Sequence, residues 1–150
     1  MRTKGMSNKG SRGQALVEFS IAVTVFLVLL MGVVDFGVAI YKYNGVSQAA
    51  REIARVTSVH PCTGTPCTLG NSPETEAVIA TKKALIPGLS APVTGFTCVD
   101  ITGTPVPAES CDYSKDSVRV TVTATYKAVT PLLGLLGTWT MQGTSSAQIQ

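Results

Sequence analysis

Two acidic residues stand out because they border an otherwise uncharged, apolar stretch of the chain. Glu18 precedes the run from Phe19 to Val34, and Asp35 follows it. A carboxylate at the edge of hydrocarbon is costly unless it is paired, although the dipole at a helix N-terminus offsets part of that cost. Glu18 is therefore either a pairing site for another charged group or a helix-end acid at the level of the lipid headgroups. The chemistry that this position offers is charge pairing.

Asp35 lies roughly 26 Å beyond Glu18 if the intervening residues are helical. That spacing predicts a position near the outer membrane interface rather than in the middle of a bilayer. Two interpretations stay open for this residue. Its side chain either extends toward the outer headgroups or pairs with another subunit or an assembly factor.

The four cysteines, which all follow the apolar stretch, could form disulfides. Four cysteines allow three pairings, and we favour Cys62–Cys67 with Cys98–Cys111 because each pair closes a short loop rich in glycine, proline or threonine. The alternative is four reduced thiols in a cytosolic domain. A zinc site is not expected, because neither pair has the spacing of a double zinc knuckle.

Several classes of function find no support in the composition or the motifs. The chain is 45% hydrophobic and only 14% charged, which favours a segment that lies in lipid. Its net charge of +3 comes from four basic residues before Gln14. These residues lie in a short leader and do not form the basic face of a folded domain that nucleic-acid binding requires. His60 stands beside a proline in a predicted loop, and no catalytic triad, phosphate loop or metal cluster is found. We therefore expect no enzyme activity, no cofactor, no metal and no small-molecule substrate.

The elements that must position Glu18 and Asp35 begin with one long helix. Residues 1–13 form a polar, basic leader that we expect to be disordered and cytoplasmic. We predict a transmembrane helix over residues 14–43. Its apolar run from Phe19 to Tyr41 would extend roughly 34 Å as a helix, which is long enough to cross a bilayer core of about 30 Å. Residues 44–60 continue it as an amphipathic helix with apolar residues at helical spacing. The basic leader places the N-terminus inside the cytoplasmic membrane and the rest of the chain outside.

Residues 61–150 predict a small extracytoplasmic domain of α+β class. Ser72-Pro73-Glu74 reads as a helix start, and that helix should run to about Leu85. Residues 94–101 are a candidate strand, and residues 117–128 alternate apolar and polar side chains as a half-buried antiparallel strand does. Residues 131–137 read as an apolar loop, and residues 138–149 as a weaker last strand.

The border of the apolar run resembles the signal of type IV pilins and pseudopilins. The stretch from Gly13 to Phe19 reads G-Q-A-L-V-E-F after a basic leader, and Asp35-Phe-Gly37 follows inside the apolar run. More closely, residues 10–57 resemble the TadE-like family of minor pseudopilins from tight-adherence (Tad) pilus systems. The remaining residues share only the general pilin-like layout.

This resemblance implies specific roles for the border residues. A prepilin peptidase would cut between Gly13 and Gln14, and Glu18 would become the fifth residue of the mature chain. In pilins that glutamate is proposed to pair with the α-amino group of a neighbouring subunit. Phe19 and Asp35 would join it as subunit-pairing residues.

The leading functional hypothesis is a non-catalytic minor pseudopilin that takes part in assembly of a Tad-type pilus, and so in cell adhesion. Its partners would be other pilin-like subunits, the pilus assembly machinery, the prepilin peptidase and membrane lipid, with no nucleic acid. The alternative is a binding module held outside the membrane by an uncleaved single-pass signal anchor. A secreted enzyme with a cleaved signal peptide is a weaker third possibility, because the apolar run is longer than such a peptide requires.

Overall fold

The fold of the chain is a long helix that carries a small domain with one further helix and one sheet. The computed structural model describes residues 9–62, 68–86, 88–89, 95–107, 111–112, 114–130, 134–135 and 137–150. Its elements are α1 (Lys9–Val59), α2 (Pro73–Leu85), β1 (Phe96–Val99), β2 (Pro105–Val106), β3 (Ser117–Lys127) and β4 (Thr138–Gln148). This arrangement confirms the predicted pilin-like α+β class.

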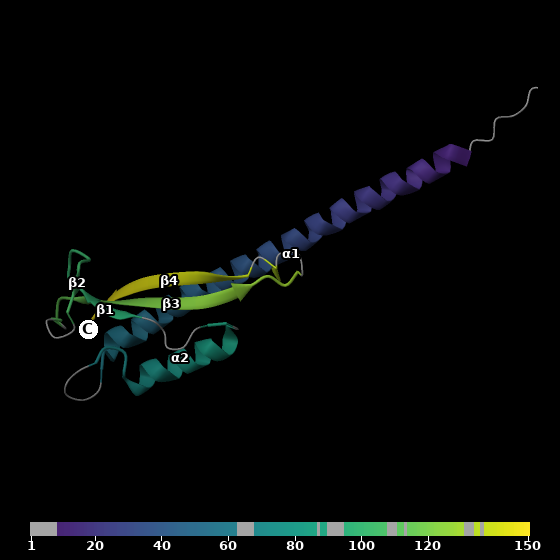
Figure 1. Cartoon of the computed structure of the whole chain (residues 1–150). Helices are drawn as coiled ribbons and strands as arrows, with labels where there is room; N and C mark the ends of the chain where they lie inside the picture. The colour runs from purple at the N-terminus through teal and green to yellow at the C-terminus, as the bar shows by residue number, and fades with distance from the viewer. Residues whose placement is uncertain are drawn as a thin grey trace, which may run out of the picture.

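Helix α1 extends as a rod well beyond the domain (Figure 1). It has 51 residues, or roughly 76 Å at the helical rise, and it continues without interruption through Asn44 and Gly45. The helix begins at Lys9, so the expectation of a disordered leader is wrong for residues 9–13. Gly10 and Gly13 are the weak helix formers there, and each glycine costs a helix only about 1 kcal/mol.

The sheet is antiparallel, with strand order β2-β1-β3-β4. In β3 the side chains alternate between the core and the outer face, as the sequence pattern predicts, and Tyr126 continues the buried series. Strand β4 pairs with β3 along its whole length, from Ser117 opposite Gln148 to Lys127 opposite Thr138. Strand β2 lies between the strands predicted over residues 94–101 and 117–128, and it was not predicted because a two-residue strand leaves no periodicity to detect.

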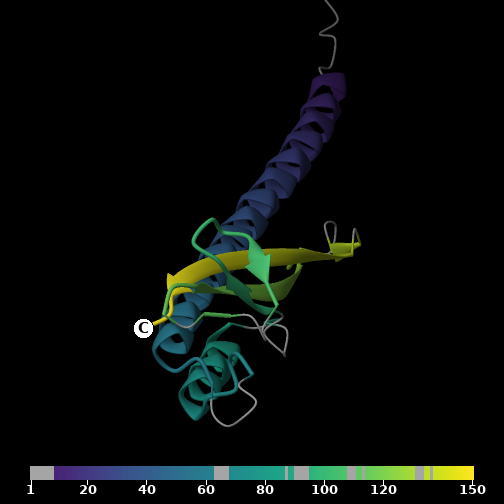
Figure 2. The ribbon, with the colours of Figure 1, turned by 90° about the vertical axis from the view of Figure 1, so that its left-hand side faces the viewer.

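The sheet packs against the second half of α1 (Figure 2). The apolar stripe of the helix is fully buried and consists of Val46, Ala49, Ala50, Ile53 and Ala54. It faces a matching row on β3, formed by Val118, Val120, Val122 and Ala124. The approach is close at Gly143 of β4, where an added Cβ would lie 3.0 Å from the carbonyl oxygen of Val46. Small residues therefore let the strand lie directly on the helix backbone.

Helix α2 packs beside α1 against the same hydrophobic core, and it starts as predicted. Ser72 is its N-cap, and its side chain accepts a hydrogen bond from the backbone N–H of Thr75 at 3.2 Å. The Thr75 hydroxyl lies 3.2 Å from that of Thr57 on α1, and both residues are buried. Lys82 forms an ion pair with Glu52 of α1. These contacts fix the two helices beside each other.

The hairpin of β3 and β4 points back along α1 toward its apolar half. Its far end lies near the C-terminus of α1, where Gln150 donates a hydrogen bond to the carbonyl of Ser58 at 3.0 Å. Its near end reaches Asp35, where the Tyr126 hydroxyl donates to the backbone carbonyl at 3.0 Å. The domain thus contacts α1 from Asp35 to the end of the helix, and the preceding apolar segment is left bare.

Candidate functional site

Asp35 lies at the junction between the bare part of α1 and the domain. Only 4% of its surface is exposed, and donors from the end of β3 surround its carboxylate. The backbone N–H of Val129 donates to Oδ1 at 2.8 Å. The Thr130 hydroxyl donates to Oδ2, and the Thr130 N–H lies 3.4 Å from both oxygens. The Asp35 carboxylate is therefore paired within its own chain.

This intramolecular partner was not foreseen from the sequence. The two interpretations of Asp35 were contact with the outer headgroups and pairing with another subunit or an assembly factor. In either case the carboxylate would have to give up its hydrogen bonds to Val129 and Thr130 and form new ones. The partners lie 91 to 95 residues further along the chain, so no local pattern connects them. The available signal was Tyr126, which continues the period of two in β3 and brings a buried hydroxyl that needs an acceptor.

Tyr126 is the aromatic centre of this junction. It is 2% exposed, its ring stacks on that of Trp139 with centroids 6.2 Å apart, and Lys42 Nζ lies 5.6 Å from its ring centroid. Burial raises the pKa of the Tyr126 hydroxyl above its ordinary value of 10.0, and the nearby charge of Asp35 and the hydrogen bond to it raise the pKa further. The neutral hydroxyl is therefore the form that holds the junction together.

Glu18 and Phe19 lie on the bare segment of α1. Both side chains are exposed, Phe19 to 68%. The hydroxyl groups of the same segment are already bonded within the helix, since Ser20 donates to the carbonyl of Leu16 at 2.8 Å and Thr24 to that of Ser20 at 2.7 Å. Within the part of the chain that the structure describes, the Glu18 carboxylate forms no ion pair. Glu18 is thus an available charge on an apolar surface, as Asp35 is not.

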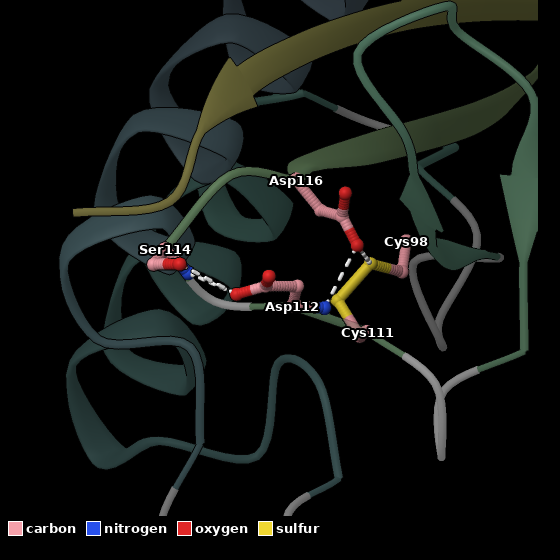
Figure 3. Close-up of a disulfide and its surroundings, with 5 residues drawn as sticks. All are labelled: Cys98, Cys111, Asp112, Ser114 and Asp116. Atoms are coloured by element: carbon pink, nitrogen blue, oxygen red, sulfur yellow. Dashed lines mark hydrogen bonds between the residues drawn. A yellow bond between two sulfur atoms is a disulfide. The ribbon is translucent and has the colours of Figure 1, made fainter.

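A disulfide closes the end of the domain that lies far from the bare helix. Cys98 of β1 is bonded to Cys111, with Cα atoms 5.9 Å apart (Figure 3). Beside it, the N–H of Asp112 donates to Oδ2 of Asp116 at 2.8 Å, and the Ser114 hydroxyl donates to Asp112. The predicted partner of Cys62 is Cys67, which lies outside the described residues, so that pair stays a prediction.

The disulfide also bears on metal binding at this end. The two sulfur atoms and a carboxylate oxygen of Asp116 lie within 4.8 Å of one another, which is a spacing that a metal ion could bridge. Zinc, however, is bound by thiolates, and both sulfur atoms are used in the bond between Cys98 and Cys111. The cluster is consequently a structural cross-link in its oxidised form.

The long helix and its domain define a class of protein and point to a family within it. Among the described residues, α1 is the one helix long and apolar enough to cross a membrane, and its apolar window is 6% buried. The chain is thus a pilin-like α+β protein with a single apolar helix suited to membrane anchoring. The TadE-like protein family matches residues 13–55, which confirms the resemblance over the segment from Gly13 through the core-facing part of α1. No curated protein and no solved structure matches the chain.

The Tyr126 hydroxyl gives the junction a measurable pH dependence. The detergent-solubilised protein is titrated to alkaline pH and tyrosinate formation is followed by absorbance. The part of this signal that Tyr126→Phe removes belongs to Tyr126. It should appear above pH 10, because burial and the charge of Asp35 oppose ionisation of the hydroxyl. The stabilisation from the neutral hydroxyl is present below about pH 10 and is lost as the pH rises through the raised pKa. The denatured protein is the control, in which this component should ionise near pH 10. A Tyr126 component at or below that pH in the folded protein contradicts the described junction.

Proposed function

We propose that this protein is a minor pseudopilin-like subunit that takes part in assembly of a Tad-type, type IV-like pilus and has no catalytic role. The match to the TadE-like family over residues 13–55 carries this proposal. The proposed partners are other pilin-like subunits, the pilus assembly machinery, the prepilin peptidase and membrane lipid. In this role the chain itself would need no cofactor and no small-molecule substrate.

The surface of α1 supports an assembly role. Large apolar side chains from Leu16 to Val34 are between 36% and 69% exposed, on all sides of the helix. Such a surface is stable only in lipid or against other apolar helices. Glu18 supplies the charge on it, and near the helix N-terminus it would lie close to the α-amino group of a neighbouring subunit. A misaligned neighbour would leave a charge unpaired in an apolar environment, so the pair would also set the register between subunits.

The domain contacts refine the predicted limits of the membrane span. We predicted a span over residues 14–43, but the domain covers one face of α1 from Asp35 onward. We therefore propose that the hydrocarbon-spanning part lies between Gln14 and Val34, a length of roughly 31 Å that matches a bilayer core of about 30 Å. The remainder of α1, including residues 44–60, then forms the support of the domain outside the membrane.

The proposed orientation has the N-terminus in the cytoplasm and the domain of residues 61–150 outside. The positively charged leader favours this orientation. The disulfide between Cys98 and Cys111 agrees with it, because disulfides persist in oxidising compartments and are rare in the cytosol. The leader itself would be removed between Gly13 and Gln14, on the cytoplasmic face.

Processing is the first test of this function. Gly13 is helical, and an added Cβ there would meet nothing within 4 Å among the described residues, so its small size serves no packing purpose in that part of the chain. Coexpression with a Tad-type prepilin peptidase should give a product that begins at Gln14, and Gly13→Leu should block the cut because a bulky side chain obstructs entry into a protease cleft. Intact-mass analysis of the purified protein reads the result.

The matched control for processing is Gly32→Leu, because Gly32 also lies on α1 with open space around it. This variant should be cut as the wild type is. A wild-type product that retains Met1 in the presence of active peptidase would favour the uncleaved, signal-anchored binding module instead. An N-terminus beyond Phe19 would contradict both.

Glu18 is the residue on which the assembly role depends. Glu18→Ala should leave membrane insertion and cleavage intact, because the helix becomes more apolar and Gly13 remains. Its association with other pilin-like subunits should weaken roughly tenfold, or by about 1.4 kcal/mol, since the partner's charge loses its counter-ion. Glu18→Asp should restore part of the association. The measurement is pull-down of a pilin-like partner at matched membrane level and matched cleavage.

Ser20→Ala is the control for Glu18, because it removes a neighbouring polar group that is already bonded to the carbonyl of Leu16. This variant should associate as the wild type does. Equal association of Glu18→Ala and wild type would mean that Glu18 is only a helix-end acid.

A further inference from the structure

The end of the β3–β4 hairpin carries exposed apolar side chains that the proposed assembly function does not explain. We call Val129, Leu135 and Trp139 the hairpin tip. They are 68%, 85% and 45% exposed. Between them, the sequence from Pro131 to Gly137 contains no charged residue. An exposed apolar group of this kind on one end of a small domain marks a surface that contacts something other than water.

The position of the hairpin tip along α1 is fixed by Asp35. Val129, the first residue of the tip, donates its backbone N–H to the Asp35 carboxylate at 2.8 Å. Trp139 pairs with Tyr126 in the sheet, and the Tyr126 hydroxyl bonds the backbone carbonyl of Asp35. The hairpin tip therefore lies beside the point where the bare apolar part of α1 ends, as the direction of the hairpin in Figure 1 also shows.

Other groups near this level are those that favour a membrane interface. Tyr41 and Tyr43 are 74% and 53% exposed, and they lie roughly 9 to 12 Å beyond Asp35 along α1. Lys127, at the end of β3, is exposed. Aromatic rings collect at the headgroup level of a bilayer, and lysine is attracted by anionic lipid. Among the described residues at this level, the one acid is Asp35, which is buried and paired.

The opposite end of the domain has a different character. Ile101 is 84% exposed there, but its neighbours are polar: Asp100 accepts hydrogen bonds from the backbone N–H groups of Thr102 and Thr104. Lys115 and Asp112 form an ion pair 3.4 Å apart. The domain is thus apolar at the end that adjoins the membrane-spanning part of α1 and polar at the end that lies far from it.

We propose that the hairpin tip is a second membrane contact, with Val129, Leu135 and Trp139 inserted at the outer interface of the bilayer that α1 spans. The lipid surface is the occupant because the hairpin tip is continuous with the bare apolar helix and reaches it where a span of roughly 31 Å from Gln14 would end. Insertion covers the exposed apolar side chains and keeps water from the bonds to Asp35. It also holds the sheet at a fixed angle to the membrane, because a helix and a hairpin together give two points of attachment.

The proposal rests on α1 spanning a membrane but not on pilus assembly, so its test needs only the full-length protein in vesicles. The vesicles contain phosphatidylcholine and phosphatidylglycerol and no pilus component. A nitroxide spin label is attached at Leu135→Cys, with Ile101→Cys as the matched control, because both residues are more than four-fifths exposed in the protein. Labelling is done without reductant so that the native disulfide stays intact. Collisions with oxygen report lipid, and collisions with a water-soluble nickel complex report water.

The expected result is an oxygen-to-nickel accessibility ratio at least about tenfold higher at Leu135→Cys than at Ile101→Cys. Equal, water-like ratios at the two sites would overturn the proposal. A label at Leu135→Cys that is shielded from both reagents would also overturn it, because a protein surface would then cover the hairpin tip in place of lipid.

Trp139 provides a second measurement that needs no substitution, because it is the one tryptophan of the chain. Its fluorescence should be quenched severalfold more strongly by lipids brominated near the headgroup than by iodide in the water. Strong quenching by iodide with none by brominated lipid would overturn the proposal even if the cysteine variants failed to fold. The spin-label accessibility and the Trp139 quenching do not depend on Glu18. A failed association test of Glu18→Ala would therefore count against the assembly role and would leave the membrane contact of the hairpin tip untouched.

Discussion

The arrangement of this protein depends on a carboxylate that lies where an apolar helix meets a folded domain. Asp35 would be costly at that border if it faced lipid, because an unpaired charge loses its hydration there. The chain resolves this by bringing two backbone N–H groups and a hydroxyl from the end of β3 to the two carboxylate oxygens. The Tyr126 hydroxyl adds a bond to the helix backbone itself. One side chain therefore joins the sheet to the helix at the end of the exposed apolar segment.

This tie divides α1 into two parts with different environments. Before Asp35 the helix has no partner among the residues that the structure describes. After it, the stripe from Val46 to Ala54 forms the helix side of the hydrophobic core. A pilin-like subunit needs both parts, because the bare part can pack with lipid or with other helices while the domain stays attached. The small residues of the stripe, together with Gly143, bring β4 onto the helix backbone so that the helix and the domain form one body. Movement of the domain would therefore be transmitted to the helix that carries Glu18.

The sequence predicted those features that leave a local pattern. The apolar run, the stripe on α1, the cap at Ser72 and the alternation in β3 are each set by residues within a few positions of one another, and the structure confirms them. The bonds between Asp35 and Thr130 join residues 95 positions apart, so the sequence offered only an acid without a visible partner. The point at which the domain begins to cover α1 was not visible in the sequence for the same reason, since the partners of Asp35 come from the end of β3.

The central claim is that Asp35 binds the hairpin to α1, and amide hydrogen exchange at Val129 and Thr130 tests it most directly. In detergent micelles, Asp35→Ala should raise exchange at these two amides about tenfold or more, because they lose their acceptors. Asp100→Ala is the control: that carboxylate accepts from the amides of Thr102 and Thr104 at the far end of the domain, so only those two should exchange faster. Unchanged protection at Val129 and Thr130 in Asp35→Ala would contradict the account.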